Sequence, residues 1–89
     1  MRFTWDPKKN AINKKKHGIS FEQAIDVFYD ERRLEFYDEE HSGGEDRWQT
    51  IGFAREVLFV VYTEREGNII RIISARCATR QEREWYYAD

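Results

Sequence analysis

Arginine residues recur along the C-terminal third of this chain at positions that suit contact with an anion. Arg71 and Arg76 interrupt the apolar run from Ile69 to Cys77, and Arg80 follows at the start of the next segment. An arginine near the core needs a counter-charge or water, because burying an isolated charge is costly. Guanidinium groups also match the geometry of phosphate groups. The spacing therefore suggests that this part of the chain binds an anion.

The segment after this run begins with a helix-start signal. Thr79 and Glu82 have the spacing of a capping box, in which each side chain binds a backbone N–H group. Arg80 lies in the first turn, where acidic residues are usual because the helix N-terminus is partly positive. A bound anion such as phosphate would explain this arginine. The alternative is that Arg76, Arg80 and Arg83 pair with neighbouring acids, as surface arginines often do.

The remaining pattern predicts the elements that position these residues. Asp6 and Pro7 are a helix N-cap and first helical residue, and Gly18 ends that helix. Ser20 and Gln23 form a second capping box. The predicted elements are a strand at 3–5, a helix to about His17, a helix with an apolar stripe from Phe21 to Phe28, strands at 34–37, 47–53, 57–62 and 69–77, and a helix after Thr79.

Four consecutive strands with short connections form a largely antiparallel sheet, with helices packed mostly on one face. The predicted fold class is α+β, a two-layer fold with a sheet of four to five strands, two N-terminal helices and a C-terminal helix, in the order β-α-α-β-β-β-β-α. Residues 1–89 are expected to form a single domain, since a chain of 89 residues has room for one small core.

Regular pleating has consequences for the last strand and for the core. Arg71 and Arg76 fall on opposite faces unless a bulge intervenes, and Cys77 shares a face with Ala75 and packs as a small apolar group. The predicted core consists of Phe21, Ile25, Phe28, Leu34, Phe36, Ile51, Phe53, Leu58, Val60, Tyr62 and part of either Ile70 and Ile72 or Ile69 and Ile73.

Charge is unevenly distributed along the chain. Lys and Arg outnumber Asp and Glu by six to one in residues 1–20, are outnumbered ten to two in residues 21–46, and stand at seven to six in residues 47–89. The net charge of −2 argues against a general nucleic-acid binder, but the basic ends suit phosphate and the acidic middle suits a basic protein partner. The alternative is that the positive and negative side chains simply neutralise each other across the protein surface.

The sequence also limits the cellular location, the disulfides and the zinc sites that are possible for this protein. The single cysteine, Cys77, excludes an internal disulfide, and no Cys/His cluster has zinc-ligand spacing. The N-terminus lacks an apolar signal core, and the longest apolar run, from Val57 to Tyr62, is too short to span a bilayer. We therefore expect a cytoplasmic protein without membrane contact.

Segments along nearly the whole chain together resemble the BrnT toxin family. The most specific are the KHG-I-S-F helix junction and the block IRIISAR-C-AT-R-Q-E-R near the C-terminus. The resemblance rests on residues 3–7, 15–24, 27–30, 45–47, 51–52, 60–65, 70–76 and 78–83.

This resemblance implies a RelE-like fold and the toxin component of a type II toxin–antitoxin system. It implies a metal-independent endoribonuclease that cleaves RNA, inhibits translation and needs no cofactor. A BrnA-type antitoxin would neutralise it and form with it a repressor of their operon, so that contact with DNA is only indirect. Free RNA and ribosome-bound RNA both remain possible substrates, and a catalytically inactive protein that only forms the antitoxin–DNA complex is the alternative.

Metal-independent RNA cleavage needs a base for the 2′-hydroxyl proton, an acid for the leaving 5′-oxygen, and cations for the charge on the phosphorus centre. The resemblance points to Arg65 and Arg80 as catalytic residues. His17 or Lys16 is a candidate proton-transfer group, although a helix C-cap without chemistry explains His17 equally well. The expected substrate-binding residues are Arg76, Arg71, Lys14, Lys15 and Arg83.

Overall fold

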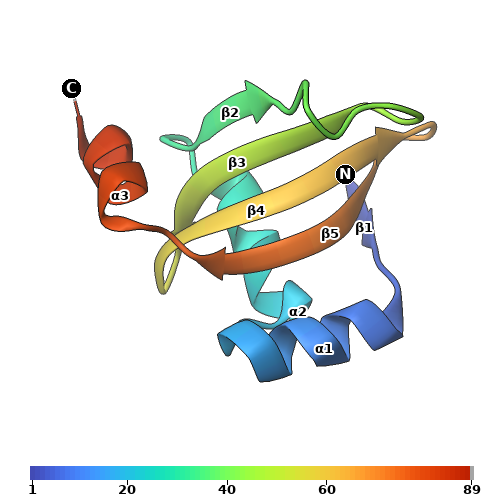
Figure 1. Ribbon diagram of the computed structural model, residues 1–89, viewed down its shortest axis with the longest axis horizontal. Coiled ribbons are helices and arrows are strands. Elements are labelled where there is room, and N and C mark those ends of the chain that lie inside the picture. The colour runs from blue at the N-terminus through green and yellow to red at the C-terminus, as the bar shows by residue number, and fades with distance from the viewer. Residues whose placement is uncertain (89) are drawn as a thin grey trace.

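The computed structural model of this protein describes residues 1–88. Its elements are β1 (Arg2–Thr4), α1 (Pro7–His17), α2 (Phe21–Ala24), the 3-10 helix η1 (Ile25–Tyr29), β2 (Leu34–Tyr37), β3 (Arg47–Ala54), β4 (Glu56–Arg65), β5 (Ile69–Cys77) and α3 (Arg80–Tyr87) (Figure 1). This order confirms the predicted α+β class. Among the described residues, no helix combines the length and apolar character needed to cross a membrane.

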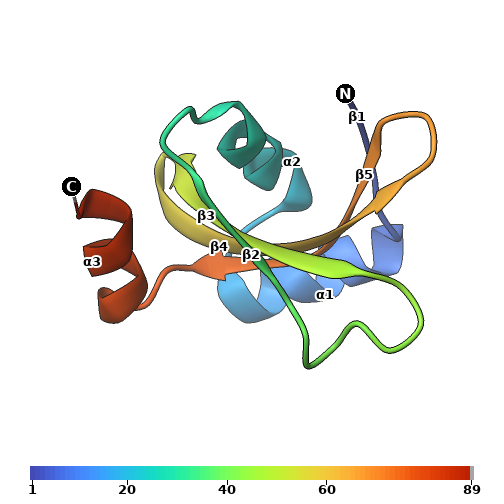
Figure 2. The ribbon, with the colours of Figure 1, turned by 90° about the horizontal axis from the view of Figure 1, so that it is seen from above.

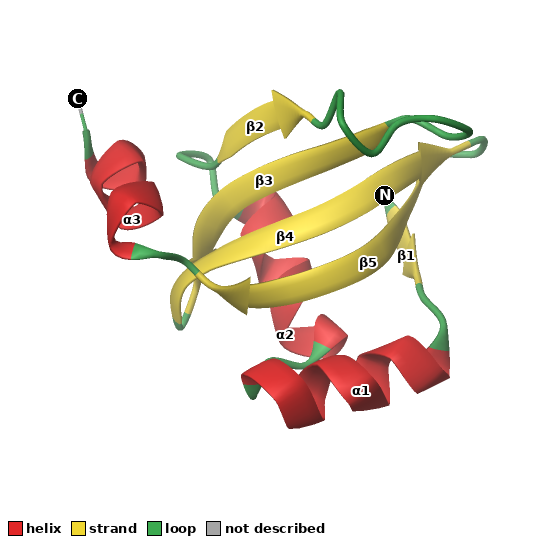
Figure 3. Cartoon of the chain, in the orientation of Figure 1, coloured by secondary structure: helices red, strands yellow, loops and turns green. Residues whose placement is uncertain are grey.

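The five strands form one sheet in the order β1-β5-β4-β3-β2. β1 runs parallel to β5, and the other neighbouring pairs are antiparallel. α2 lies behind the sheet in Figure 1, α1 runs along its β5 side, and α3 stands at one end. Figure 3 shows that the face turned toward the viewer carries no helix across its middle. We call this side the open face.

Helices cover the other face and form the main core with it. Leu58, Val60 and Tyr62 of β4 pack there with Phe21 and Phe28, and all five side chains are buried. Burial of large apolar side chains is the dominant stabilising contribution in a domain of this size. Figure 2 shows α2 against this covered side of the curved sheet.

The predicted burial in the core is wrong for two residues. Phe36 is 39% exposed and Phe53 is 48% exposed. Phe36 is paired with Gln49, and Phe53 with Val57, so both alternate onto the open face, away from the main core. Phe36 is covered only in part, by Trp85 of α3, whose ring centre lies 6.3 Å from its own. Of the two alternatives for the last strand, Ile70 and Ile72 are the buried pair.

The helix boundaries follow the predicted capping signals, with one difference. The Asp6 side chain accepts a hydrogen bond from the Lys8 N–H group, and Gly18 ends α1 with a φ of 73°. Ser20 Oγ accepts from the Gln23 N–H group at 3.0 Å, which is one half of the predicted capping box; the Gln23 side chain donates instead to the Ala54 carbonyl at 2.9 Å. The predicted second helix, however, is α-helical only through α2 and continues as the tighter η1.

A β-bulge changes the faces of β5. Val61 pairs with Ser74 and Tyr62 pairs with Ile72, so Ile73 is an extra residue in β5. The alternation of side chains reverses at this point. Arg71 and Arg76 therefore lie on the same face of the sheet, the open face. A regular strand would have placed them on opposite faces, and the bulge is the exception that the sequence analysis allowed for.

The predicted packing of Cys77 is also wrong. Its side chain is exposed and its Sγ donates a hydrogen bond to Glu56 Oε1 at 3.0 Å. This bond raises the pKa of the thiol, and burial and the negative charge of Glu56 act in the same direction. Cys77 is consequently held as a neutral thiol at the end of β5.

Asn13 joins α1 to the edge of β5 beyond the three residues that pair with β1. Its Nδ2 group donates to the Ala75 carbonyl at 2.7 Å and to the Ile19 carbonyl at 2.9 Å, and its Oδ1 accepts from the Ala75 N–H group at 3.1 Å. The side-chain amide thus takes the place of a neighbouring strand. This contact fixes α1 beside the open face.

Candidate functional site

The open face is built from three rows of paired residues across β3, β4 and β5. Directly paired residues on neighbouring strands share a face, so each row projects from one side of the sheet. The rows are Arg47–Thr63–Arg71, Gln49–Val61–Ser74 and Ile51–Phe59–Arg76. By alternation Arg65, two residues after Thr63, also lies on this side. Arginines from three adjacent strands therefore converge on the open face, whose middle carries no helix and whose one end packs against α3.

Arg76 is bound by neighbouring groups at the α3 end of this face. Its guanidinium donates to both carboxylate oxygens of Glu82, at 2.7 and 3.0 Å, and lies 4.1 Å from the centre of the Phe59 ring. Glu82 also accepts from the Thr79 N–H group at 2.8 Å, which completes the predicted capping box. Arg76 therefore positions α3 on the sheet, and its pairing with an acid matches the alternative that the sequence left open.

Glu82 is held as a carboxylate by these contacts. Burial raises the pKa of Glu82, but the hydrogen bonds from Arg76 and from the Thr79 backbone outweigh it, so the pKa lies below the usual 4.5. A lowered folded-state pKa stabilises the fold above the unfolded-state value, and this contribution is lost as the pH falls through the folded-state pKa.

Glu82→Gln should therefore lower the stability at pH 7 and flatten its decline below about pH 4.5. Urea unfolding at pH 7 and at acidic pH measures both effects. Glu84→Gln is the matched control, because Glu84 forms only an exposed ion pair with Arg80 on the same helix. An unchanged acid profile in Glu82→Gln would contradict this role for Glu82.

The two arginines expected to be catalytic lie at opposite ends of the sheet. Arg65 is paired with Ile69 at one end of β4, whereas Arg80 follows Cys77, which is paired with Leu58 near the other end. Seven residues of strand separate these pairs, which is roughly 23 Å at the rise of a β-strand. The structure therefore does not bring Arg65 and Arg80 to the same phosphate group.

Both of these arginines carry acidic partners. Arg65 Nε lies 3.2 Å from Glu45 Oε2, and Arg80 Nε lies 3.4 Å from Glu84 Oε1. The Arg80 side chain is 89% exposed, so its ion pair is weak and open to exchange for another anion. Arg83 donates to the Ala78 carbonyl at 2.9 Å and supports the beginning of α3.

α1 brings part of its basic group to the β5 edge of the open face. Lys16 and His17 line a hollow of about 210 Å³ together with Ser74, which lies between Arg71 and Arg76 along β5. Lys14 is oriented differently: its charge contributes to the lowered pKa of Glu22, after the larger effect of the hydrogen bond from Asn10. Lys15 is exposed on the same turn.

Sequence reasoning missed two residues of this face, Arg47 and Thr63. Arg47 begins a predicted strand but was not assigned to the site, and Thr63 follows the predicted central strand. Only the pairing between β3, β4 and β5 places them beside Arg71. The alternation within each strand indicates which residues share a face with Arg47 and with Thr63, but the register between strands is needed to align the two residues with Arg71.

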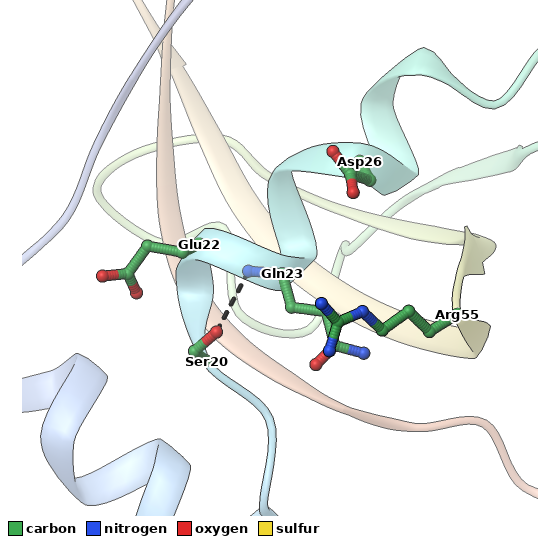
Figure 4. Close-up of a pocket in the computed structure, with 5 residues that line it drawn as sticks. All are labelled: Ser20, Glu22, Gln23, Asp26 and Arg55. Atoms are coloured by element: carbon green, nitrogen blue, oxygen red, sulfur yellow. Dashed lines mark hydrogen bonds between the residues drawn. The ribbon is translucent and has the colours of Figure 1, made fainter.

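A second hollow lies on the covered side of the molecule, beside α2. It has a volume of about 260 Å³ and is lined by Ser20, Glu22, Gln23, Asp26 and Arg55 (Figure 4). None of the predicted site residues reaches it. Nowhere among residues 1–88 do three or more His, Cys, Asp or Glu side chains gather in an arrangement that would hold a metal ion.

Comparison with known proteins connects this architecture to a family. The family model described as "Ribonuclease toxin, BrnT, of type II toxin-antitoxin system" matches residues 5–82. The crystal structure of the Brucella abortus ribonuclease toxin BrnT is similar, with a TM-score of 0.73 and 24% sequence identity, and the match covers 90% of this chain and 99% of that one. No curated protein sequence matches the chain.

The family match spans β3, β4 and β5 as well as both N-terminal helices, and therefore includes the open face. The similarity to the Brucella protein independently supports the fold. This chain belongs to the BrnT family of type II toxin–antitoxin systems, a family described as ribonuclease toxins.

Proposed function

We propose that this protein is a metal-independent endoribonuclease that cleaves RNA and inhibits translation, with the RNA strand lying along the open face. The observation that carries the proposal is the convergence of arginines from three adjacent strands on an uncovered side of an otherwise slightly acidic protein. Guanidinium groups in such an array attract a chain of phosphates. The description of the family as ribonuclease toxins supports the same activity.

The proposed reaction uses the RNA's own 2′-hydroxyl group. The 2′-oxygen forms a bond to the adjacent phosphorus while the bond from phosphorus to the 5′-oxygen breaks, which leaves a 2′,3′-cyclic phosphate and a 5′-hydroxyl. One side chain takes the 2′-hydroxyl proton and another supplies a proton to the 5′-oxygen. His17 and Lys16 are the proposed proton-transfer groups, because they line a hollow at the β5 edge together with Ser74, a residue of the open face.

The proposed catalytic cations are Arg65 and Arg80, which would stabilise negative charge that builds up during the reaction. Since they lie at opposite ends of the face, an RNA strand several nucleotides long would contact them at different phosphates. Arg71 and Lys15 would add further contacts to the RNA backbone through charge, while Lys14, beside Glu22, and Arg83, bound to the Ala78 carbonyl, would act only through their longer-range charge. Arg76 would serve by positioning α3, because Glu82 already neutralises it.

Inducible expression in a bacterial host tests the proposed activity. The wild-type protein should arrest growth, and total RNA or translated messages should be degraded soon after induction. A variant with both proposed proton-transfer groups removed, His17→Ala with Lys16→Ala, should allow growth at similar protein levels. Normal growth and intact RNA with abundant wild-type protein would contradict the proposal.

The toxin of a type II system acts with an antitoxin, and we propose that the partner here is a BrnA-type protein that also binds the operator DNA. The acidic segment of residues 30–46 is its proposed contact surface. Within this segment Asp38 is buried and accepts hydrogen bonds from His41, so it orders the loop. Glu39 and Glu40 remain exposed and available to a basic partner.

Charge reversal at these two positions, Glu39→Lys with Glu40→Lys, should weaken the antitoxin complex because it removes the attraction to a basic surface. Calorimetric titration at low and high salt measures the change, with the largest loss at low salt. Glu64→Lys with Glu66→Lys is the charge-matched control at exposed positions outside residues 30–46. Unchanged affinity in the loop variant would remove this surface from the proposal.

A binding protein without catalysis is the second candidate. The ion pairs of Arg65 with Glu45, Arg76 with Glu82 and Arg80 with Glu84 favour it, because each occupies a cation that a nuclease would use. Such a protein would bind the antitoxin and leave RNA intact. A nuclease that requires a translating ribosome would also leave purified RNA intact. Adding translating ribosomes to an RNA cleavage assay distinguishes such a nuclease from a protein without catalysis.

A further inference from the structure

One buried hydroxyl group on the open face lacks a partner. Thr63 is 1% exposed, and its Oγ1 atom is the single buried side-chain oxygen or nitrogen without a hydrogen-bond partner among residues 1–88. Almost all buried polar groups in folded proteins are hydrogen-bonded, so such an atom calls for an explanation. A ligand that accepts a hydrogen bond from this hydroxyl provides one.

The two residues on either side of Thr63 are arginines. Arg47 of β3 and Arg71 of β5 are both paired with Thr63 across the sheet, so the three side chains form one row on the open face. Within the described part of the chain, neither guanidinium forms an ion pair or a hydrogen bond to another side chain, whereas Arg33, Arg65, Arg76 and Arg80 each pair with a glutamate. Two unpaired cations therefore flank the unpaired hydroxyl.

We propose that the Arg47–Thr63–Arg71 row is a phosphodiester-binding subsite for the RNA strand. One backbone phosphate accepts hydrogen bonds from the two guanidinium groups and from the Thr63 hydroxyl. As the guanidinium groups turn outward onto the phosphate, the hydroxyl between them becomes accessible. The subsite lies beside Arg65, at the end of the face remote from α3.

This inference rests on the proposed function, because it names where that RNA is held. The inference adds residues to the proposed function, because Arg47 and Thr63 carry no role in the proposed cleavage reaction. A phosphate fits the row better than a cation or an apolar group, since the row offers two positive charges and one hydroxyl donor. The pairing of β4 with β3 on one side and with β5 on the other holds the three residues at fixed spacing.

The experiment measures binding of a fluorescein-labelled twelve-nucleotide RNA with 2′-O-methyl groups, which cannot be cleaved through the 2′-hydroxyl. Fluorescence anisotropy of the full-length protein is recorded over a series of salt concentrations. The variants are Arg47→Gln, Arg71→Gln and Thr63→Val. Arg55→Gln is the matched control, because Arg55 is an exposed arginine beside α2 on the covered side.

Each row arginine should contribute similarly to affinity. Arg47→Gln and Arg71→Gln should each weaken binding about tenfold, as expected for a lost charged hydrogen bond. Each should also reduce the slope of log affinity against log salt by about 0.7, the value for one phosphate contact on a single strand. Arg55→Gln should bind as the wild type does.

Thr63→Val separates a ligand contact from a structural role. Valine removes the unpaired hydroxyl at nearly constant volume, so the melting temperature should stay the same or rise. RNA binding should nevertheless weaken about fivefold, because the phosphate loses one donor. A structural threonine would give the opposite pattern, with lower stability and unchanged affinity, and would overturn its place in the subsite.

The outcomes also separate this inference from the proposed function. If Arg47→Gln and Arg71→Gln bind RNA as Arg55→Gln does while the wild type cleaves unmodified RNA, only the subsite is wrong. If the wild type neither binds the modified RNA nor cleaves the unmodified one, the subsite and the proposed function both fail. Selective loss of affinity in the row variants supports the subsite.

Discussion

Arg65→Ala and Arg80→Ala should both slow RNA cleavage, by about a hundredfold for the arginine at the cleaved phosphate, the usual loss when one donor that stabilises developing negative charge is removed. The other arginine, which would hold a different phosphate of the same strand, should cost about tenfold, as expected for a lost charged hydrogen bond. Both side chains are exposed and paired only with single glutamates, so their loss should leave the fold intact. Cleavage of a labelled RNA by purified protein measures the rate. Circular dichroism and the melting temperature confirm that each variant is folded.

Arg55→Ala is the control for both variants, because it removes the same charge from the covered side of the sheet. The variants should also retain antitoxin binding, which distinguishes a lost catalytic group from a damaged surface. Arg65 lies at one end of the sheet and Arg80 follows the other end, so the sizes of the two effects identify the end at which the cleaved phosphate lies. Full activity in both variants would show that neither arginine is catalytic.

Asn13→Ala should destabilise the protein by about 3 kcal/mol. Three buried backbone hydrogen bonds depend on this one side chain, which joins Ala75 of β5 to the loop at Ile19. Leaving buried backbone groups without partners costs about 1–3 kcal/mol each, and water entering the gap recovers part of the loss. Since small domains are stable by only about 5–15 kcal/mol, the variant should unfold at much lower urea concentration.

Lys15→Ala is the control for this stability measurement, because Lys15 is an exposed residue of the same helix and alanine favours helices. Its unfolding midpoint should match that of the wild type. Asn13→Asp should also be destabilised, since a carboxylate lacks the two N–H donors that the carbonyl groups need. A stable Asn13→Ala protein would mean that β1 and α1 hold the side of β5 without this amide.

Local signals account for most of the fold that the sequence predicts. The Asp6 N-cap, the Gly18 C-cap and the Thr79–Glu82 capping box depend on neighbouring residues and form as expected, while the Ser20–Gln23 box forms only its Ser20 half. The bulge at Ile73 could not be predicted, because it arises from pairing between β4 and β5 rather than from either strand alone. Phe36 and Phe53 were misplaced for the same reason: apolar character does not reveal which face a helix covers.

The candidate site was predicted in part. The resemblance pointed to Arg65, Arg71 and the basic end of α1, and the structure places Arg65 and Arg71 on the open face with Lys16 at its β5 side. The alignment of Arg47 with Thr63 depends on strand register, which one sequence does not specify. The pairing partners of the other arginines could not be read from the sequence either. Arg76 is held by Glu82, as the alternative interpretation has it, whereas the exposed pair of Arg80 with Glu84 leaves Arg80 able to bind a phosphate.

The central claim is that the open face cleaves RNA through the 2′-hydroxyl group, and product analysis tests it most directly. Purified wild-type protein is incubated with an end-labelled RNA, with and without translating ribosomes, beside a matched RNA with 2′-deoxy sugars. The account predicts fragments that end in a 2′,3′-cyclic phosphate from the RNA and no cleavage of the 2′-deoxy strand. An intact RNA in both conditions, with protein that still binds its antitoxin, would contradict the account and favour the binding protein without catalysis.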